Sequence, residues 1–139
     1  MDFLTLAKKR FSVRKFEDRP VEKNKIIQIL KAGMQAPSAC NQQPWEFYVV
    51  TDKEKIGLLS QTTPYAGCAA GAPVVIIPVY RTESLPAPSM IPIDMGLSLE
   101  NIWLETDALG LGGVCIGISP VPEFMEPVCR ILQLPDNLK

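Results

Sequence analysis

One long stretch, residues 91–109, constrains the fold more than any other part of the sequence. Apolar side chains recur there at helical spacing, and further apolar residues lie beside them on a second side: Ile93, Leu97, Leu104 and Ala108, then Leu99, Ile102 and Trp103. A helix that is apolar on nearly all sides is normally buried. The pattern therefore predicts a central helix with the rest of the chain packed around it.

Shorter helices and strands alternate along the remaining sequence. Spacing and punctuation predict helices over 2–9, 21–35, 52–61 and 121–132, strands over 46–51, 73–80 and 114–118, and a surface loop over 81–89. Asp52 is expected to cap the helix that follows it. This order predicts one α/β or α+β domain over residues 1–139. Residues 134–139 resemble the approach to another strand, so we expect a C-terminal strand and extension to be missing.

Composition excludes several kinds of chemistry. The 139 residues include no histidine, which rules out a Ser-His-Asp triad, a Cys-His pair and a histidine-based metal site. The four cysteines form no C-x-x-C pair, and the N-terminus does not read as an export signal, so the thiols are expected to be reduced in a cytoplasmic protein. A net charge of −1 and short apolar runs predict neither nucleic-acid nor membrane partners.

The segment Arg10-Phe-Ser-Val-Arg-Lys-Phe16 places Arg10, Ser12 and Arg14 on one face if it is extended. In a helix, the two arginines would still share a face. Two guanidinium groups and a hydroxyl suit a phosphate or a polarised carbonyl oxygen. The alternative is a solvated basic face without a ligand, and this segment, taken alone, favours that alternative.

The ten residues from Ala36 to Trp45 lie between a predicted helix and a predicted strand. Ser38, Asn41 and Gln43 could bond the polar edge of a planar heterocycle, and the small Ala39 permits close backbone approach. The alternative is an elaborate turn in which Asn41 caps itself and Trp45 fills the core. The two interpretations are about even, although so dense a stretch is hard to explain as a connector.

Other candidates are weaker. Gly110-Leu-Gly-Gly113 follows a helix and precedes a strand, opposite to the dinucleotide fingerprint, so a left-handed helix stop is the default interpretation. Asp94, Glu100 and Glu105 could be acid–base groups, but solvated or salt-bridged positions are more common on a long helix. The remaining candidates are a nucleophilic Cys40, which lacks an obvious base, and Tyr65 and Phe124, for which core or lid packing is favoured over stacking on a substrate.

Taken together, these segments resemble the nitroreductase family. Residues 10–16 resemble its R-x-S-x-R opening, and Pro37-Ser-Ala-Cys-Asn-Gln-Gln-Pro-Trp45 resembles its P-S-x-x-N-x-Q-P-W signature. Asp94-Met-Gly, Glu100-Asn101 and Ala108-Leu-Gly-Leu-Gly-Gly113 resemble the family's central helix and glycine turn. The order and spacing agree from the N-terminus to about Leu138.

The resemblance implies an α+β sandwich with a central, mostly antiparallel sheet flanked by helices, forming an intertwined homodimer. It implies one noncovalent FMN at each of two subunit interfaces. Arg10, Ser12 and Arg14 would hold its phosphate, ribityl chain and flavin edge, and Gly112 and Gly113 would approach it through backbone. From the partner subunit, the signature loop would contribute Pro37, Ser38, Ala39 and Asn41, with Gln43 supporting the loop.

The activity implied by the resemblance is hydride transfer from NAD(P)H to flavin N5, then to a nitroaromatic, quinone or similar small acceptor. No catalytic side chain and no metal are implied, because the flavin performs the chemistry. Two alternatives stay open: the same flavin fold with reductive dehalogenation or flavin breakdown, and a degenerate flavin-binding protein without activity. Family members continue past the position of Lys139, so the present sequence is expected to be a truncated form.

Overall fold

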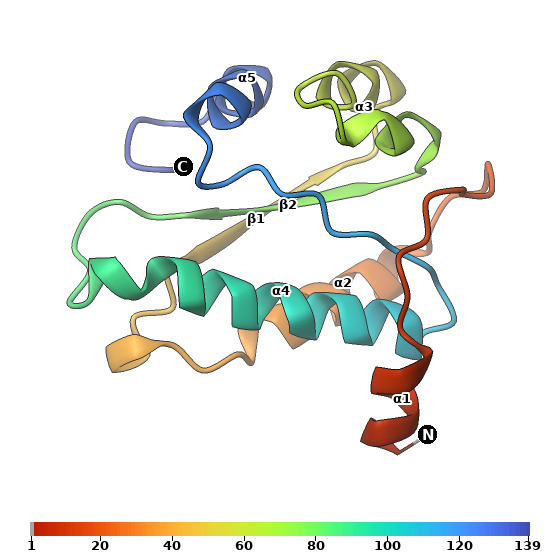
Figure 1. The fold of residues 1–139 in the computed structure, drawn as a ribbon, viewed down its shortest axis with the longest axis horizontal. Coiled ribbons are helices and arrows are strands. Elements are labelled where there is room, and N and C mark those ends of the chain that lie inside the picture. The colour runs from red at the N-terminus through yellow and green to blue at the C-terminus, as the bar shows by residue number, and fades with distance from the viewer. Residues whose placement is uncertain (1) are drawn as a thin grey trace.

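Two antiparallel strands separate two helical layers (Figure 1). The computed structural model describes residues 2–139. Strands β1 (Trp45–Val50) and β2 (Val75–Tyr80) lie between α3 (Lys53–Leu59) and α5 (Pro122–Leu132) on one face and α2 (Lys23–Met34) and α4 (Ile91–Ala108) on the other. Helix α1 (Phe3–Lys9) lies near the C-terminal end of α4. Short 3₁₀ helices are η1 (Ala39–Asn41), η2 (Ala66–Gly71) and η3 (Pro88–Met90). The predicted α+β sandwich is confirmed.

The alternation of side chains along the strands divides the core in two. Val50 pairs with Val75 in the register of the sheet, and this side carries the cluster of Val50, Ile56, Leu59 and Val128 beneath α3 and α5. Phe47 belongs to the opposite face, where it approaches Gly33 of α2. Each face of the sheet is therefore covered by a pair of helices.

Most predicted elements occur close to their expected bounds. Helix α2, both strands, α4 and α5 agree to within about two residues at each end. Helix α3 ends at Leu59, two residues before the predicted end, and the Asp52 carboxylate caps its start by accepting from Lys55 N–H at 2.8 Å. Gly110 has φ +73°, so the predicted left-handed stop after α4 is confirmed.

The predicted strand at 114–118 was wrong. Within the described residues, this segment forms no ladder, and only Gly113 makes an isolated parallel bridge, to Ser12. β-Branched residues and alternating burial are present, but a strand also requires a neighbour with which to exchange hydrogen bonds. The segment instead has no regular secondary structure.

The prediction that α4 is buried nearly all round was also wrong for the single chain. Its buried residues are Ile91, Asp94, Ser98 and Ile102. Ile93 and Leu97 lie on the exposed side, with 56% and 42% of their surfaces accessible. Hydrophobic spacing identified the helix, but two of the four residues that face the core are polar.

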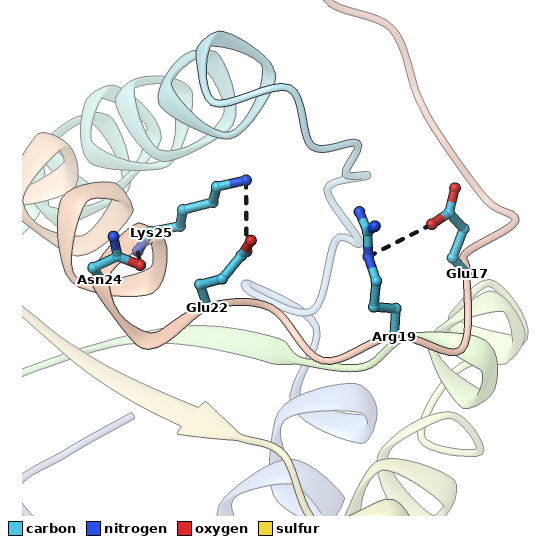
Figure 2. A network of polar contacts seen from close by, with 5 residues as sticks. All are labelled: Glu17, Arg19, Glu22, Asn24 and Lys25. Carbon is cyan, nitrogen blue, oxygen red and sulfur yellow. Dashed lines mark hydrogen bonds and ion pairs between the residues drawn. The ribbon is translucent and has the colours of Figure 1, made fainter.

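Residues 16–25 connect the N-terminal segment to α2 along the surface (Figure 2). Two pairs there are local: Arg19 Nε lies 3.8 Å from Glu17 Oε2, and Lys25 Nζ lies 3.5 Å from Glu22 Oε2. A third pair joins the segment to α3, because Lys53 Nζ lies 3.2 Å from Asp18 Oδ1. The partners are mostly exposed, so solvent screens them and they contribute little to stability.

The last residues pair with the end of β2. Leu138 is buried and bridges antiparallel to Arg81, while Lys139 and Tyr80 exchange backbone hydrogen bonds at 2.7 and 3.0 Å. The sheet is thus extended beyond β2 by a short pairing, in agreement with the strand-like appearance of residues 134–139. Across residues 2–139, none of the helices combines the length and apolar character that crossing a membrane requires.

Gly33 marks the closest approach of α2 to α4 and β1. A Cβ atom there would lie 2.8 Å from Ile102 Cγ1 and 3.2 Å from Phe47 Cζ, closer than packed carbon atoms tolerate. Gly57 in α3, by contrast, has open space within 4 Å of an added Cβ.

We therefore expect the same substitution to have different effects at the two glycines. Gly57→Ala should stabilise the protein by up to about 1 kcal/mol, because alanine is the better helix former. The free energy of unfolding of Gly33→Ala should be lower than that of Gly57→Ala by about 1–3 kcal/mol, because overpacking usually costs this much. Urea denaturation of both variants measures this difference, and equal free energies of unfolding would contradict the packing described.

Candidate functional site

The residues predicted to form a site fall into two groups at opposite ends of α4 (Figure 1). One group contains the N-terminal segment and the glycine turn. The other is the loop between α2 and β1, which is bound to the first turn of α4.

In the first group, residues 12 and 113 are brought together by backbone pairing. Ser12 and Gly113 form a parallel bridge, and Val13 N–H donates to the Gly113 carbonyl at 2.9 Å. A Cβ on Gly112 would lie 2.8 Å from Val13 Cγ2, so any larger residue there would push the N-terminal segment away. In extended backbone the neighbours of Val13 point to the other side. Ser12, Gly112 and Gly113, which the family resemblance assigns to one cofactor, therefore lie close together in the fold, and their contact with FMN stays a prediction.

Arg10 packs against α4. Its guanidinium carbon lies 4.1 Å from the centroid of the Trp103 ring, a cation–π geometry. Within residues 2–139, Arg10 Nη1 and Trp103 Nε1 are buried without a hydrogen-bond partner. Burial raises the pKa of nearby Asp107, while the positive charge of Arg10 acts in the opposite direction. Buried donors without partners are rare in native proteins and require an explanation such as a bound water, ion or ligand.

Arg14 lines a cleft of about 500 Å³ together with Tyr65, Cys68 and the backbone segment 114–117. This volume lies within the range of small-molecule and cofactor sites. Sequence analysis did not assign the segment 114–117 or Cys68 to a site. It favoured core or lid packing for Tyr65, but 73% of the Tyr65 surface is exposed. The backbone at 114–117 provides polar groups that no strand partner uses. No local sequence pattern indicates such a site, because it depends on the absence of a neighbouring strand.

The thiol of Cys115 in this cleft is not activated. Desolvation, followed by the negative charge of Glu100, raises its pKa above the usual value. Because the thiolate is the reactive form, Cys115 is predominantly protonated near neutral pH. A cysteine nucleophile is therefore unsupported here.

The second group is a tightly folded loop. Cys40, Asn41 and Gln43 all have positive φ, between 43° and 52°, although none is glycine. The Ser38 hydroxyl oxygen accepts from Gln43 N–H at 2.9 Å, and Asn41 Oδ1 accepts from Gln43 Nε2 at 3.2 Å. These bonds use acceptors only, so the Ser38 O–H and the Asn41 NH₂ are left to donate outward. Gln43 supports the loop, as predicted, and Trp45 is buried in the core, as the alternative interpretation expected.

Two buried side chains anchor this loop from beneath. Asp94 is 2% exposed and accepts from Ala39 N–H at 2.9 Å and from Gln42 Nε2 at 2.7 Å. Gln42 also exchanges two hydrogen bonds with the backbone of Ala87, at 2.9 and 3.0 Å. The expectation that Asp94 would be solvated or salt-bridged was wrong, because both of its oxygens are used inside the protein. Gln42 was missed, since nothing local distinguishes it from Gln43.

Arg81 holds the far side of the loop. Its Nη2 donates to the carbonyls of Gln42 and Gln43 at 2.9 and 3.0 Å, and its backbone N–H donates to the Pro44 carbonyl. These bonds join the loop to the end of β2. The Pro37–Gln43 backbone is thus fixed from α4, from the segment before η3 and from β2.

The two groups do not meet within one chain. Asp94 is in the first turn of α4 and Thr106, which lies 3.6 Å from the Cβ position of Gly113, is in its last. At about 1.5 Å per residue, these positions are about 18 Å apart along the helix axis. A ligand that contacted both groups of one chain would therefore have to span most of the length of α4.

Comparison with known proteins agrees with this architecture. The model of the nitroreductase family matches residues 7–67 and 59–139. A Methanothermobacter thermautotrophicus protein, provisionally named an NADH dehydrogenase/NAD(P)H nitroreductase, is 34% identical over 99% of this chain and 72% of its own length.

Solved structures share the fold closely. A Clostridium acetobutylicum protein, provisionally named an NADH oxidase, superposes with a TM-score of 0.94 at 40% identity, over 96% of this chain and 81% of its own. An FMN-dependent nitroreductase from Clostridium difficile gives 0.92 at 30% identity, over 99% and 82%. With a family model that spans almost the whole sequence and relatives that match nearly all of this chain, the chain belongs to the nitroreductase family.

Proposed function

We propose that this protein is an FMN-dependent oxidoreductase that passes electrons from NAD(P)H to small organic acceptors such as nitroaromatics and quinones. The observation that carries the proposal is the cleft beside Arg14, bounded by unpaired backbone at 114–117 and next to the Ser12–Gly113 bridge. Membership of the family, and the FMN dependence of the Clostridium difficile relative, support it.

The residues around the cleft fit a flavin mononucleotide. Arg14 and the buried, unpartnered Nη1 of Arg10 supply positive charge and a donor for a phosphate. Ser12 adds a hydroxyl, and the backbone of Gly112 and Gly113 lies close to the N-terminal segment, where the side chain of Val13 packs against Gly112. The cleft beside them has the volume and the backbone polar groups that a planar ring system requires.

Bound FMN would supply the hydride chemistry that the side chains of this protein lack, accepting hydride at N5 from the nicotinamide and passing it to the acceptor. The protein would position both substrates against the ring. Arginine and amide donors at the polar edge of the flavin favour negative charge there. Tyr65, exposed at the cleft, offers a surface on which a planar acceptor can stack.

The second half of the site is proposed to come from a second copy of the chain. Pro37, Ser38, Ala39 and Asn41 lie at the opposite end of α4 from Arg14, and the bonds within the loop use Ser38 and Asn41 only as acceptors. Apolar side chains that a single chain leaves exposed include Ile93 and Leu97 on α4 and Phe3 and Leu4 on α1. Large apolar side chains that gather on an exposed surface mark protein interfaces. A homodimer would cover it and bring the two groups together.

Removal of the Arg14 side chain tests the cofactor site. Arg14→Ala should weaken FMN binding about 10- to 100-fold, since hydrogen bonds to charged groups contribute about 1.5–3 kcal/mol. Arg130→Ala, which removes an exposed arginine from α5, is the matched control and should bind FMN normally. Titration of the apoprotein followed by flavin fluorescence measures both. Equal affinity in the two variants would contradict a cofactor role for Arg14.

Mixed dimers test whether two copies share each site. Arg14→Ala and Asn41→Ala homodimers should each be defective at both sites. In a mixed dimer of the two variants, one site would contain both native residues and should recover wild-type FMN affinity. Co-expression with two affinity tags and flavin titration of the purified mixed dimer gives the result. If the mixed dimer binds no better than its parents, the site lies within one chain.

A charge on the exposed side of α4 tests the interface. Leu97→Glu should convert the dimer to a monomer, because the glutamate would be buried without a partner. Leu58 on α3 is similarly exposed, at 50% against 42% for Leu97, so Leu58→Glu should leave the dimer intact. Sedimentation velocity distinguishes the two variants. A Leu97→Glu dimer as tight as the wild type would place the interface elsewhere.

A further inference from the structure

The loop from Pro37 to Gln43 holds a conformation that its own residues do not favour. Three non-glycine residues, Cys40, Asn41 and Gln43, have left-handed backbone angles in close succession. Such strain persists only where surrounding groups over-determine the conformation, and it is concentrated at functional sites. The contacts that hold this loop are therefore as important to its shape as the sequence of the loop itself.

Asp94 is the deepest of these contacts. One carboxylate oxygen accepts from the backbone of Ala39 and the other accepts from the Gln42 side chain. In the described part of the chain, no lysine or arginine lies within ion-pair distance of Asp94. Its charge is instead favoured by its position in the first turn of α4, where the helix dipole is positive. Both carboxylate oxygens thus accept hydrogen bonds from the loop.

The polarity of the network determines which loop groups stay free. Gln42 Nε2 donates to both Asp94 and the Ala87 carbonyl, while Gln42 Oε1 accepts from Ala87 N–H. Every polar atom of the Gln42 amide is directed inward. The donors of Ser38 and Asn41 then remain on the outer side of the loop, where a ligand could use them.

We infer that Asp94, acting through Ala39 N–H and Gln42, is a positioning residue that sets the cofactor-facing donors of this loop for the partner subunit's site. The inference rests on the proposed function, because it takes the loop to face FMN. Asp94 does not touch the flavin, and it acts at a distance by fixing where the Ser38 and Asn41 donors point. Its effect is consequently exerted on the site of the other copy.

The variant Asp94→Asn isolates this role. Asparagine keeps one acceptor for Ala39 N–H, but its NH₂ then faces the NH₂ of Gln42, donor against donor. FMN affinity should fall about 10- to 100-fold, the loss expected when a buried hydrogen bond to a charged group is replaced by a mismatch. The double variant Asp94→Asn/Gln42→Glu restores the donor–acceptor pair between residues 94 and 42, but it loses the bond from Gln42 Nε2 to the Ala87 carbonyl. It should therefore recover only part of that affinity.

Ser98→Ala is the matched control. Ser98 is fully buried on the same face of α4, and within residues 2–139 its hydroxyl has no hydrogen-bond partner. The substitution perturbs the same helix without touching the loop, so it should leave FMN affinity unchanged. Hydrogen exchange of the Ala39 amide, measured without FMN, should accelerate in Asp94→Asn and stay protected in Ser98→Ala.

Mixed dimers separate positioning from general damage. An Asp94→Asn chain should complement Arg14→Ala, because one site then has a native loop and a native arginine, and it should fail to complement Asn41→Ala. Wild-type FMN affinity in Asp94→Asn, complementation of Asn41→Ala, or complementation of neither variant would each overturn the inference. Failure of Arg14→Ala and Asn41→Ala to complement each other would instead refute the two-copy site, and the Ala39 exchange rate would still report whether Asp94 holds the loop.

Discussion

The packing of α4 against α2 and the sheet is the constraint on which the rest of the structure depends. Because Gly33 has no side chain, Ile102 of α4 and Phe47 of β1 can pack directly against the backbone of α2. This packing fixes the position of α4 relative to β1. Both candidate groups are attached to this helix, one at each end. Any shift of α4 would therefore move the Pro37–Gln43 loop and the glycine turn together.

Much of the fold could be predicted from local patterns, because those patterns reflect local physics. The Asp52 cap and the left-handed Gly110 depend on residues a few positions apart, and β1 and β2 were recognisable from short runs of β-branched, aromatic and apolar residues. The strand predicted at 114–118 failed for the opposite reason, since pairing depends on a neighbour far away in the sequence. The buried face of α4 was likewise hidden, because Asp94 and Ser98 are polar and their burial depends on what the fold places beside them.

The candidate site shows the same division. Arg14, Ser12 and the loop residues were identified through motifs that resemble a family, and that family is confirmed. Their assignment to FMN stays a prediction. The motifs gave no indication of the role of Gln42, because this role depends on hydrogen bonds to Asp94 and Ala87, which are distant in the sequence. They also gave no indication of the cleft beside Arg14, which is formed by segments from three parts of the chain. A motif can identify residues of a site, whereas the cleft between those residues is formed only by the tertiary structure.

The absence of glycine at the left-handed positions of the loop has a consequence for protein engineering. Replacing Cys40 or Gln43 by glycine would relieve backbone strain in the native state, and many stabilising strategies would choose these positions first. Glycine would, however, also allow the loop conformations that the present residues forbid. A variant library selected only for heat resistance could therefore accumulate loops that no longer hold one shape. Selection at these positions should score ligand retention and melting temperature as separate traits.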